Sequence, residues 1–240
     1  MRMLRVVCSL IATFPLAGAV HGADSASITG KVSFDGTPPK PKKIKMDADP
    51  QCAAMHADSP AFYEDVVVND NGTLKNVFVY IKSGLPAGKT YETPKEPVTI
   101  NQKGCHYEPH VFGMMAKQLL LIKNSDDTLH NIHAMPTINE EFNKGQPSGS
   151  PDLKRTFTKP EVMVHFKCDV HPWMSAYVGV LDNPFYSVTG NDGTFSLKDL
   201  PAGEYEVVAW HEKYGEQSQK VKVGEGEAKT SDFKFSKPAE

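Results

Sequence analysis

The 240-residue sequence lacks the features that mark several common functional classes. It has no basic excess, with 26 Lys and Arg against 29 Asp and Glu and a formal net charge of −3. This excludes a strongly basic nucleic-acid-binding protein, because such proteins need a concentrated cationic surface to neutralise phosphates. The motifs His-Glu-x-x-His and Gly-x-Ser-x-Gly are absent, as is a second metal-ligand cluster. We therefore expect that the protein is not an enzyme and that no nucleic acid is among its partners.

Long apolar runs are also scarce. The longest, residues 6–20, follows Arg2 and Arg5, is short for a bilayer span and leads into small residues. This pattern predicts a cleaved secretory signal peptide over residues 1–22, the alternative being an N-terminal anchor helix. No other segment approaches spanning length, so we expect no membrane span in the mature chain and a periplasmic or secreted location.

Helical periodicity is missing from the remainder, which alternates between apolar and polar residues. Residues 28–34 alternate and end at a turn, and residues 77–81 follow the turn signal 69–72. A further set of short alternating segments continues to residue 210. The pattern predicts an all-β protein, with residues 37–60 and 84–97 as irregular connections.

Only four cysteines are present, and one of them, Cys8, lies within the predicted signal peptide. Cys52, Cys105 and Cys168 remain, which is an odd number for an oxidising compartment. One thiol is therefore either free or bound to something other than sulfur.

The surroundings of Cys168 suggest a metal. It ends the alternating segment 162–168, on the same face as Val162, Val164 and Phe166, and starts a Cys-x2-His-x2-Met motif with His171 and Met174. Thiolate, imidazole and thioether together form a soft ligand set that favours copper. The alternatives are a structural zinc site or a merely buried cysteine, but zinc normally takes a fourth strong donor, which leaves Met174 unexplained.

A second imidazole is needed, and His130 and His133 follow a predicted buried strand upstream. The combination of Asn124-Ser125-Asp126, His130-Asn131 and the loop 168–174 resembles the cupredoxin family of amicyanin- and plastocyanin-like blue copper domains, over residues 98–181. The resemblance implies a Greek-key sandwich with one copper ion. It also implies that Cys168, His130 and His171 are trigonal ligands and Met174 the axial ligand. His130 is preferred because Asn follows it directly; His133 is the weaker choice, and His110 is a candidate additional ligand or neighbour of the site.

The segments on either side suggest a second β module. Residues 189–210 resemble the carboxypeptidase regulatory-like family, a transthyretin-like sandwich, and residues 28–36 look like its opening strand. The expected organisation is an N-terminal β module at 24–97, a copper domain at 98–183 and a C-terminal β module at 184–240. Either the cupredoxin is inserted in one sandwich made from both chain ends, or three modules follow one another.

These features predict a one-electron carrier with an unidentified redox protein partner. The alternatives are copper binding or delivery without redox cycling, and a structural interaction module. We further expect a Cys52–Cys105 disulfide, since Cys168 would be occupied by metal. His171 is expected to bring its ring edge near the surface beside Pro172 and Trp173, and residues 210–212 could bind metal, face the copper domain or simply lie at the surface.

Overall fold

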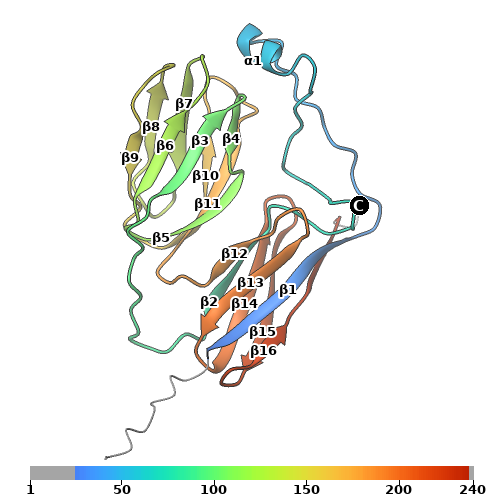
Figure 1. Cartoon of the computed structure of the whole chain (residues 1–240), viewed down its shortest axis with the longest axis vertical. Helices are drawn as coiled ribbons and strands as arrows, with labels where there is room; N and C mark the ends of the chain where they lie inside the picture. Colours follow the sequence, from blue (N-terminus) through green and yellow to red (C-terminus); the bar gives the residue numbers. More distant parts are fainter. Residues whose placement is uncertain (1–24, 238–240) are drawn as a thin grey trace, which may run out of the picture.

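The computed structural model describes residues 25–237, which form two β-rich domains and one short helix (Figure 1). The predicted signal peptide lies outside the described residues. We call residues 98–181 the inserted domain, and the strands before and after it the outer sandwich. Within the described residues, no helix is long and apolar enough to cross a bilayer.

The outer sandwich combines strands from both ends of the chain. One sheet has the order β13-β1-β16, with β17 also paired to β1, and the other has the order β12-β2-β14-β15. β1 runs antiparallel to β13 and parallel to β16 and β17, so the chain ends share a sheet. The strands are β1 (Ala26–Asp35), β2 (Phe78–Ser83), β12 (Tyr186–Val188), β13 (Thr194–Leu200), β14 (Gly203–His211), β15 (Gly215–Val223), β16 (Ala228–Thr230) and β17 (Phe233–Ser236).

The inserted domain is a second pair of sheets. A five-stranded sheet of order β5-β11-β10-β7-β8 faces a four-stranded sheet of order β4-β3-β6-β9 across a buried apolar core. The strands are β3 (Val98–Lys103), β4 (His106–Glu108), β5 (Val111–Met115), β6 (Leu120–Asn124), β7 (His130–Met135), β8 (Phe142–Gln146), β9 (Leu153–Arg155), β10 (Glu161–Lys167) and β11 (Ser175–Leu181).

The connection between β1 and β2 leaves the outer sandwich and reaches the inserted domain. Sequence patterns predicted an irregular segment here, but it contains the helix α1 (Pro50–Met55), which Figure 1 places far from β15 and β16. The Asp49 side chain caps α1 by accepting hydrogen bonds from the backbone N–H groups of Gln51 and Cys52, and Pro50 occupies the first turn. Six residues are too few for a visible helical period.

A disulfide fastens this connection to the inserted domain. Cys52 of α1 is bonded to Cys105 between β3 and β4, which confirms the predicted pairing. Both cysteines are fully buried and pack with Ile44 and Met46 in a small apolar cluster.

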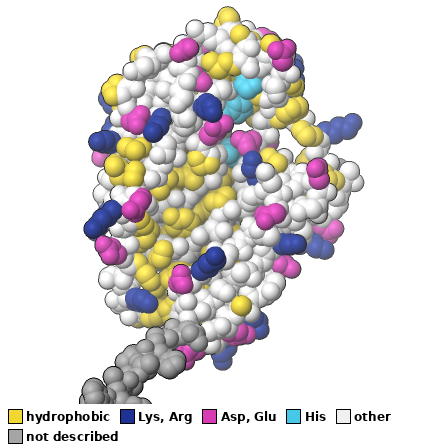
Figure 2. Space-filling view, in the orientation of Figure 1, with side chains coloured by type: hydrophobic (Ala, Val, Ile, Leu, Met, Phe, Trp, Pro, Cys, Tyr) yellow, Lys and Arg dark blue, Asp and Glu magenta, His cyan; other side chains and the backbone are white. Residues whose placement is uncertain are grey.

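The two domains also meet through a packed interface. Phe78 and Val208 of the outer sandwich share an apolar cluster with Val111 and Leu181 of the inserted domain. A Cβ atom at Gly179 would lie only 2.2 Å from the Phe78 ring, so only glycine allows this approach without rearrangement. Figure 2 shows apolar side chains gathered over the junction of the two domains.

Candidate metal centre

β10 delivers Cys168 to the core of the inserted domain. Val164, Phe166 and Cys168 are buried as their alternation predicts. Val162 is not, because β10 bulges between Glu161 and Val164, with Met163 at a φ of 64°. The bulge turns Val162 and Met163 toward the cluster between the two domains. The prediction that Val162 shares the core face of Cys168 is therefore wrong.

The loop after Cys168 is tightly closed. The backbone N–H of Met174 donates to the His171 carbonyl at 2.9 Å, and the Cys168 N–H to the Met174 carbonyl at 3.3 Å. The His171 N–H donates to the Cys168 sulfur at 3.3 Å. These bonds hold Cys168, His171 and Met174 together with side chains at most 2% exposed, and Met174 and Cys168 share one apolar core.

His130 enters the same place from the start of β7. Its Nδ1 atom lies 2.9 Å from Nδ1 of His171, and the Cys168 sulfur lies 3.9 Å from the latter atom. The ligand atoms of His130, Cys168 and His171 all lie within 4.8 Å of one another. The structure therefore brings two imidazoles and a thiol together beside the buried Met174.

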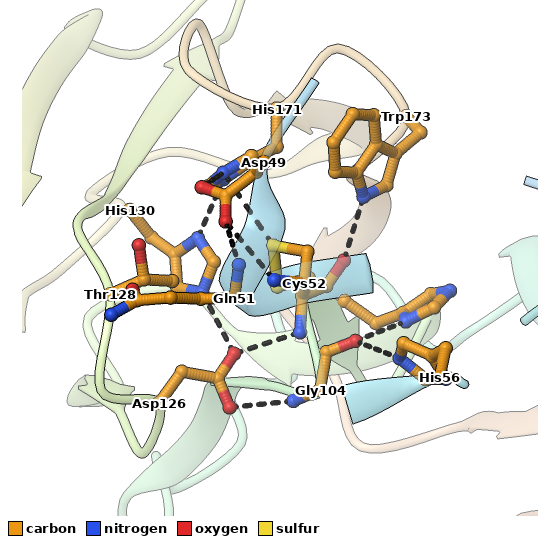
Figure 3. The surroundings of a disulfide bond; sticks show 12 residues. Asp49, Gln51, Cys52, His56, Gly104, Asp126, Thr128, His130, His171 and Trp173 are labelled. Atoms are coloured by element: carbon orange, nitrogen blue, oxygen red, sulfur yellow. Dashed lines mark hydrogen bonds and ion pairs between the residues drawn. A yellow bond between two sulfur atoms is a disulfide. The ribbon is translucent and has the colours of Figure 1, made fainter. Parts of the chain in front are cut away.

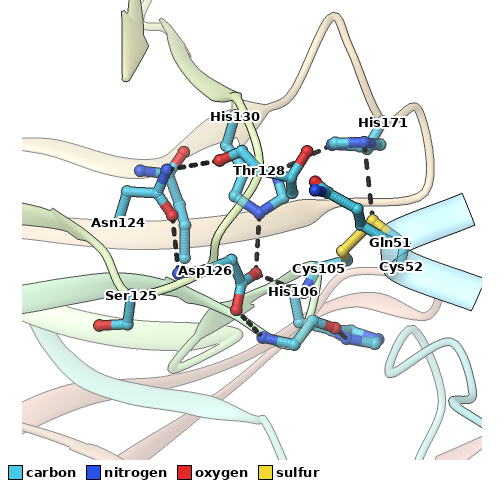
Figure 4. A network of polar contacts seen from close by, with 12 residues as sticks. Gln51, Cys52, Cys105, His106, Asn124, Ser125, Asp126, Thr128, His130 and His171 are labelled. Carbon is cyan, nitrogen blue, oxygen red and sulfur yellow. Dashed lines mark hydrogen bonds and ion pairs between the residues drawn. A yellow bond between two sulfur atoms is a disulfide. The ribbon is translucent and has the colours of Figure 1, made fainter. Parts of the chain in front are cut away.

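A carboxylate holds the second nitrogen of each imidazole. Nε2 of His130 donates to Asp126 at 2.8 Å (Figure 4). Nε2 of His171 donates to Asp49 at 2.9 Å (Figure 3). With a proton on each Nε2, both Nδ1 atoms present a lone pair to the same point, as two imidazoles that bind one metal ion do. Together with the soft Cys168 and Met174, this donor set fits copper.

The protonation of the thiol and of Asp126 agrees with this arrangement. Burial alone would raise the pKa of Cys168, but the hydrogen bond with His130 and those with backbone groups outweigh burial and bring that pKa below its ordinary value. Burial likewise opposes ionisation of Asp126, yet His130 and the N–H groups of Gly104 and Cys105 lower its pKa overall. Both groups are thus prepared to be anionic beside a cation.

Asn131 connects the two ligand segments. Its side-chain oxygen accepts from the backbone N–H groups of Asp169 and Val170 at 2.6 and 3.3 Å, and lies 3.2 Å from the Cys168 sulfur. Its own carbonyl accepts from the Tyr107 hydroxyl at 2.5 Å. The His130-Asn131 pair in the sequence was the only signal for this role, whereas nothing in the sequence indicated Asp49.

The other candidate histidines lie elsewhere. His133 contacts Asp169 at 3.1 Å and Glu141 at 2.7 Å, away from the ligand cluster. His110 contacts the Ser175 carbonyl and Glu212. It therefore belongs to the interface between the two domains and lies outside the candidate metal centre. Within residues 210–212, Glu212 contacts His110 and Trp210 lies 5.0 Å from the Tyr177 ring, so both face the inserted domain, as one of the alternatives predicted.

The expected exposure of His171 is wrong. Its side chain is 2% exposed, because Asp49 and the Cys52 sulfur, 3.6 Å from Nε2, cover its outer edge (Figure 3). Pro172 is exposed, while Trp173 is half-buried, lies 5.1 Å from the His171 ring and donates from Nε1 to the Cys105 carbonyl. Trp173 and Met174 line a cavity of about 390 Å³ that opens between the two domains.

Comparison with known proteins finds distant matches among solved structures. No protein-family model and no curated protein matches the sequence. Among solved structures, a copper-containing nitrite reductase from Thermus scotoductus is 20% identical, with a TM-score of 0.34, over 42% of this chain and 26% of its own. A Cu(I) form of an amicyanin variant is 18% identical, with a TM-score of 0.31, over 42% of this chain and 97% of its own.

A purple cupredoxin from Nitrosopumilus maritimus is 18% identical, with a TM-score of 0.29, over 34% of this chain and 97% of its own. At these identities and TM-scores the matches carry no conclusion about the activity of this chain. The chain spans about a quarter of the nitrite reductase, and the relation of the outer sandwich to carboxypeptidase regulatory-like modules stays a prediction.

Proposed function

We propose that the protein is a periplasmic or secreted mononuclear copper protein that carries one electron between redox partners. The observation that carries the proposal is the pair of imidazole nitrogens 2.9 Å apart beside the Cys168 thiol and Met174. Bound copper would supply the Cu(I)/Cu(II) couple. The residues that would hold it are His130, Cys168, His171 and Met174.

The protein's own contribution is a rigid, dry ligand cage. The closed loop 168–174 and the Asn131 contacts to it fix the donors before metal binds, so few atoms need to move when the charge of the metal changes. Asp126 keeps His130 in the tautomer with Nδ1 free. Such preorganisation suits a carrier, because electron exchange is fast when little rearrangement accompanies it.

The buried His171 changes the expected contact with a partner. Its ring lies 5.1 Å from that of Trp173, which borders the cavity between the domains with the exposed Pro172. A redox protein docking there would approach the ligand loop without displacing α1. Redox encounters are typically small and transient, so a contact limited to the border of this cavity is sufficient for one.

The proposal is tested with purified protein by adding Cu(II) and then ascorbate while recording the visible spectrum. A carrier gives an intense thiolate-to-copper absorption at one copper per chain, which ascorbate bleaches and an oxidant restores over repeated cycles. Tight copper binding without a reversible colour favours copper delivery instead. Exclusive tight binding of zinc would overturn the copper assignment.

A further inference from the structure

The connection between β1 and β2 supplies a contact to the candidate metal centre from outside the inserted domain. Asp49 lies 122 residues before His171 in the sequence, and its Oδ2 atom accepts from Nε2 of His171 at 2.9 Å (Figure 3). The Asp49 side chain is 21% exposed and that of His171 only 2%. Asp49 therefore lies between solvent and the outer edge of a candidate copper ligand.

The position of Asp49 is fixed by more than this contact. Its Oδ1 atom caps α1, accepting from the backbone N–H groups of Gln51 and Cys52 at 2.8 and 3.0 Å. Cys52 is tied to Cys105 by the disulfide. One carboxylate oxygen is thus held by the helix while the other is aimed at His171, so the carboxylate has little freedom to turn away.

Resting on the copper site proposed above, we propose that Asp49 is a positioning residue for copper. By holding the proton of His171 on Nε2, it leaves Nδ1 free toward Nδ1 of His130 and the Cys168 sulfur. Its negative charge makes the imidazole a stronger donor and stabilises the more highly charged Cu(II). The segment that connects β1 to β2 of the outer sandwich thereby completes the metal centre of the inserted domain.

Two variants of Asp49 separate its role as the cap of α1 from its role in positioning His171. Serine is as good a cap as aspartate but is too short and uncharged to replace the contact to His171, whereas alanine removes both functions. Asp49→Ser and Asp49→Ala should therefore share any defect at the metal and differ in stability. Asp47→Ser is the matched control, because Asp47 is exposed on the same segment.

The first measurement needs no copper. Nitrogen-15 NMR of the metal-free, disulfide-intact protein should show the proton of His171 on Nε2 in the wild type and in Asp47→Ser. In Asp49→Ser and Asp49→Ala it should be shared with Nδ1. The same tautomer in all four proteins would overturn the proposal. Because this readout is independent of metal, it stands even if the wild type proves not to cycle copper.

The second measurement is copper affinity and reduction potential. Asp49→Ser and Asp49→Ala should bind Cu(II) about 10- to 100-fold more weakly, the usual cost of removing a partner of a metal-bound histidine, and their potentials should rise. Asp47→Ser should match the wild type. Wild-type affinity and potential in Asp49→Ser, with lower stability only in Asp49→Ala, would show that Asp49 is a helix cap alone.

Discussion

Each nitrogen of the two facing imidazoles has a distinct task. Asp126 and Asp49 accept hydrogen bonds from the Nε2 N–H groups, and the Nδ1 atoms converge with the thiol of Cys168. His133, only three residues from His130, has both of its ring nitrogens on carboxylates and none directed at the thiol. Local side-chain chemistry thus distinguishes ligand from neighbour where spacing alone does not.

Substitution of the ligands should give graded effects. Cys168→Ser should abolish the thiolate-to-copper absorption, because only a thiolate supplies that transition, while Met174→Leu should keep the colour and shift the potential. His130→Ala should weaken copper binding more than the matched variant His133→Ala. Absorption spectra, copper titration and voltammetry of the four variants check these effects. Greater damage from His133→Ala would exclude His130 as the ligand.

At the scale of elements, the tether formed by α1 and the disulfide holds a segment with little regular structure. The linkage closes 53 residues of chain, and both cysteines are fully buried. Without it, the part of the connection that reaches the inserted domain is attached there by the small apolar cluster around Ile44 and Met46, while Leu74 and Val77 stay in the core of the outer sandwich.

Removing the disulfide should therefore destabilise the protein. Cys52→Ser/Cys105→Ser should lower the free energy of unfolding of the metal-free protein by about 2–4 kcal/mol, the usual contribution of a native disulfide. Urea unfolding followed by tryptophan fluorescence measures the change. The double variant avoids leaving one unpaired thiol, and the wild type after reduction serves as the comparison. An unchanged unfolding midpoint would contradict the role of the tether.

The sequence predicts the strands well, since alternation depends on neighbouring residues. The face of Cys168 and the loop to Met174 could be predicted for the same reason. The face of Val162 could not, because the bulge at Met163 changes the register. Asp49 could not be predicted either, because a six-residue helix leaves no periodic pattern and its contact to His171 spans 122 residues. The prediction that His171 lies near the surface was wrong because Asp49, which covers its ring edge, could not be identified from the sequence.

At the scale of the whole molecule, the interface between the domains contains a buried ion pair. Nε2 of His110 donates to Glu212 at 2.5 Å, with side chains 7% and 10% exposed. Burial alone would lower the pKa of His110, but the hydrogen bond and charge of Glu212, with smaller contributions from Glu64 and the Ser175 carbonyl, raise that pKa above the ordinary 6.5. Stability from this pair is fully present below pH 6.5 and is lost as pH rises through the raised pKa.

The pair should give the interface a measurable pH dependence. Glu212→Gln should lower the free energy of unfolding by about 1–2 kcal/mol below pH 6.5, since a charged hydrogen bond is lost, and have less effect as pH rises. Glu225→Gln, at an exposed residue, is the matched control. Urea unfolding between pH 5.5 and pH 8.5 tests this, and an effect that is constant across pH would exclude a charged His110.

The pairing of β1 with β13, β16 and β17 has a consequence for the order of folding. A chain made from its N-terminus exposes β1 and β2 long before residues 186–236 exist, while every strand of the inserted domain lies between these two groups. Contacts between chain ends form slowly, because so much intervening chain must first be brought together. The inserted domain has all of its strands before the last partners of β1 are available, so it can form first. Until β13, β16 and β17 arrive, β1 keeps an open edge that is available for association with other chains.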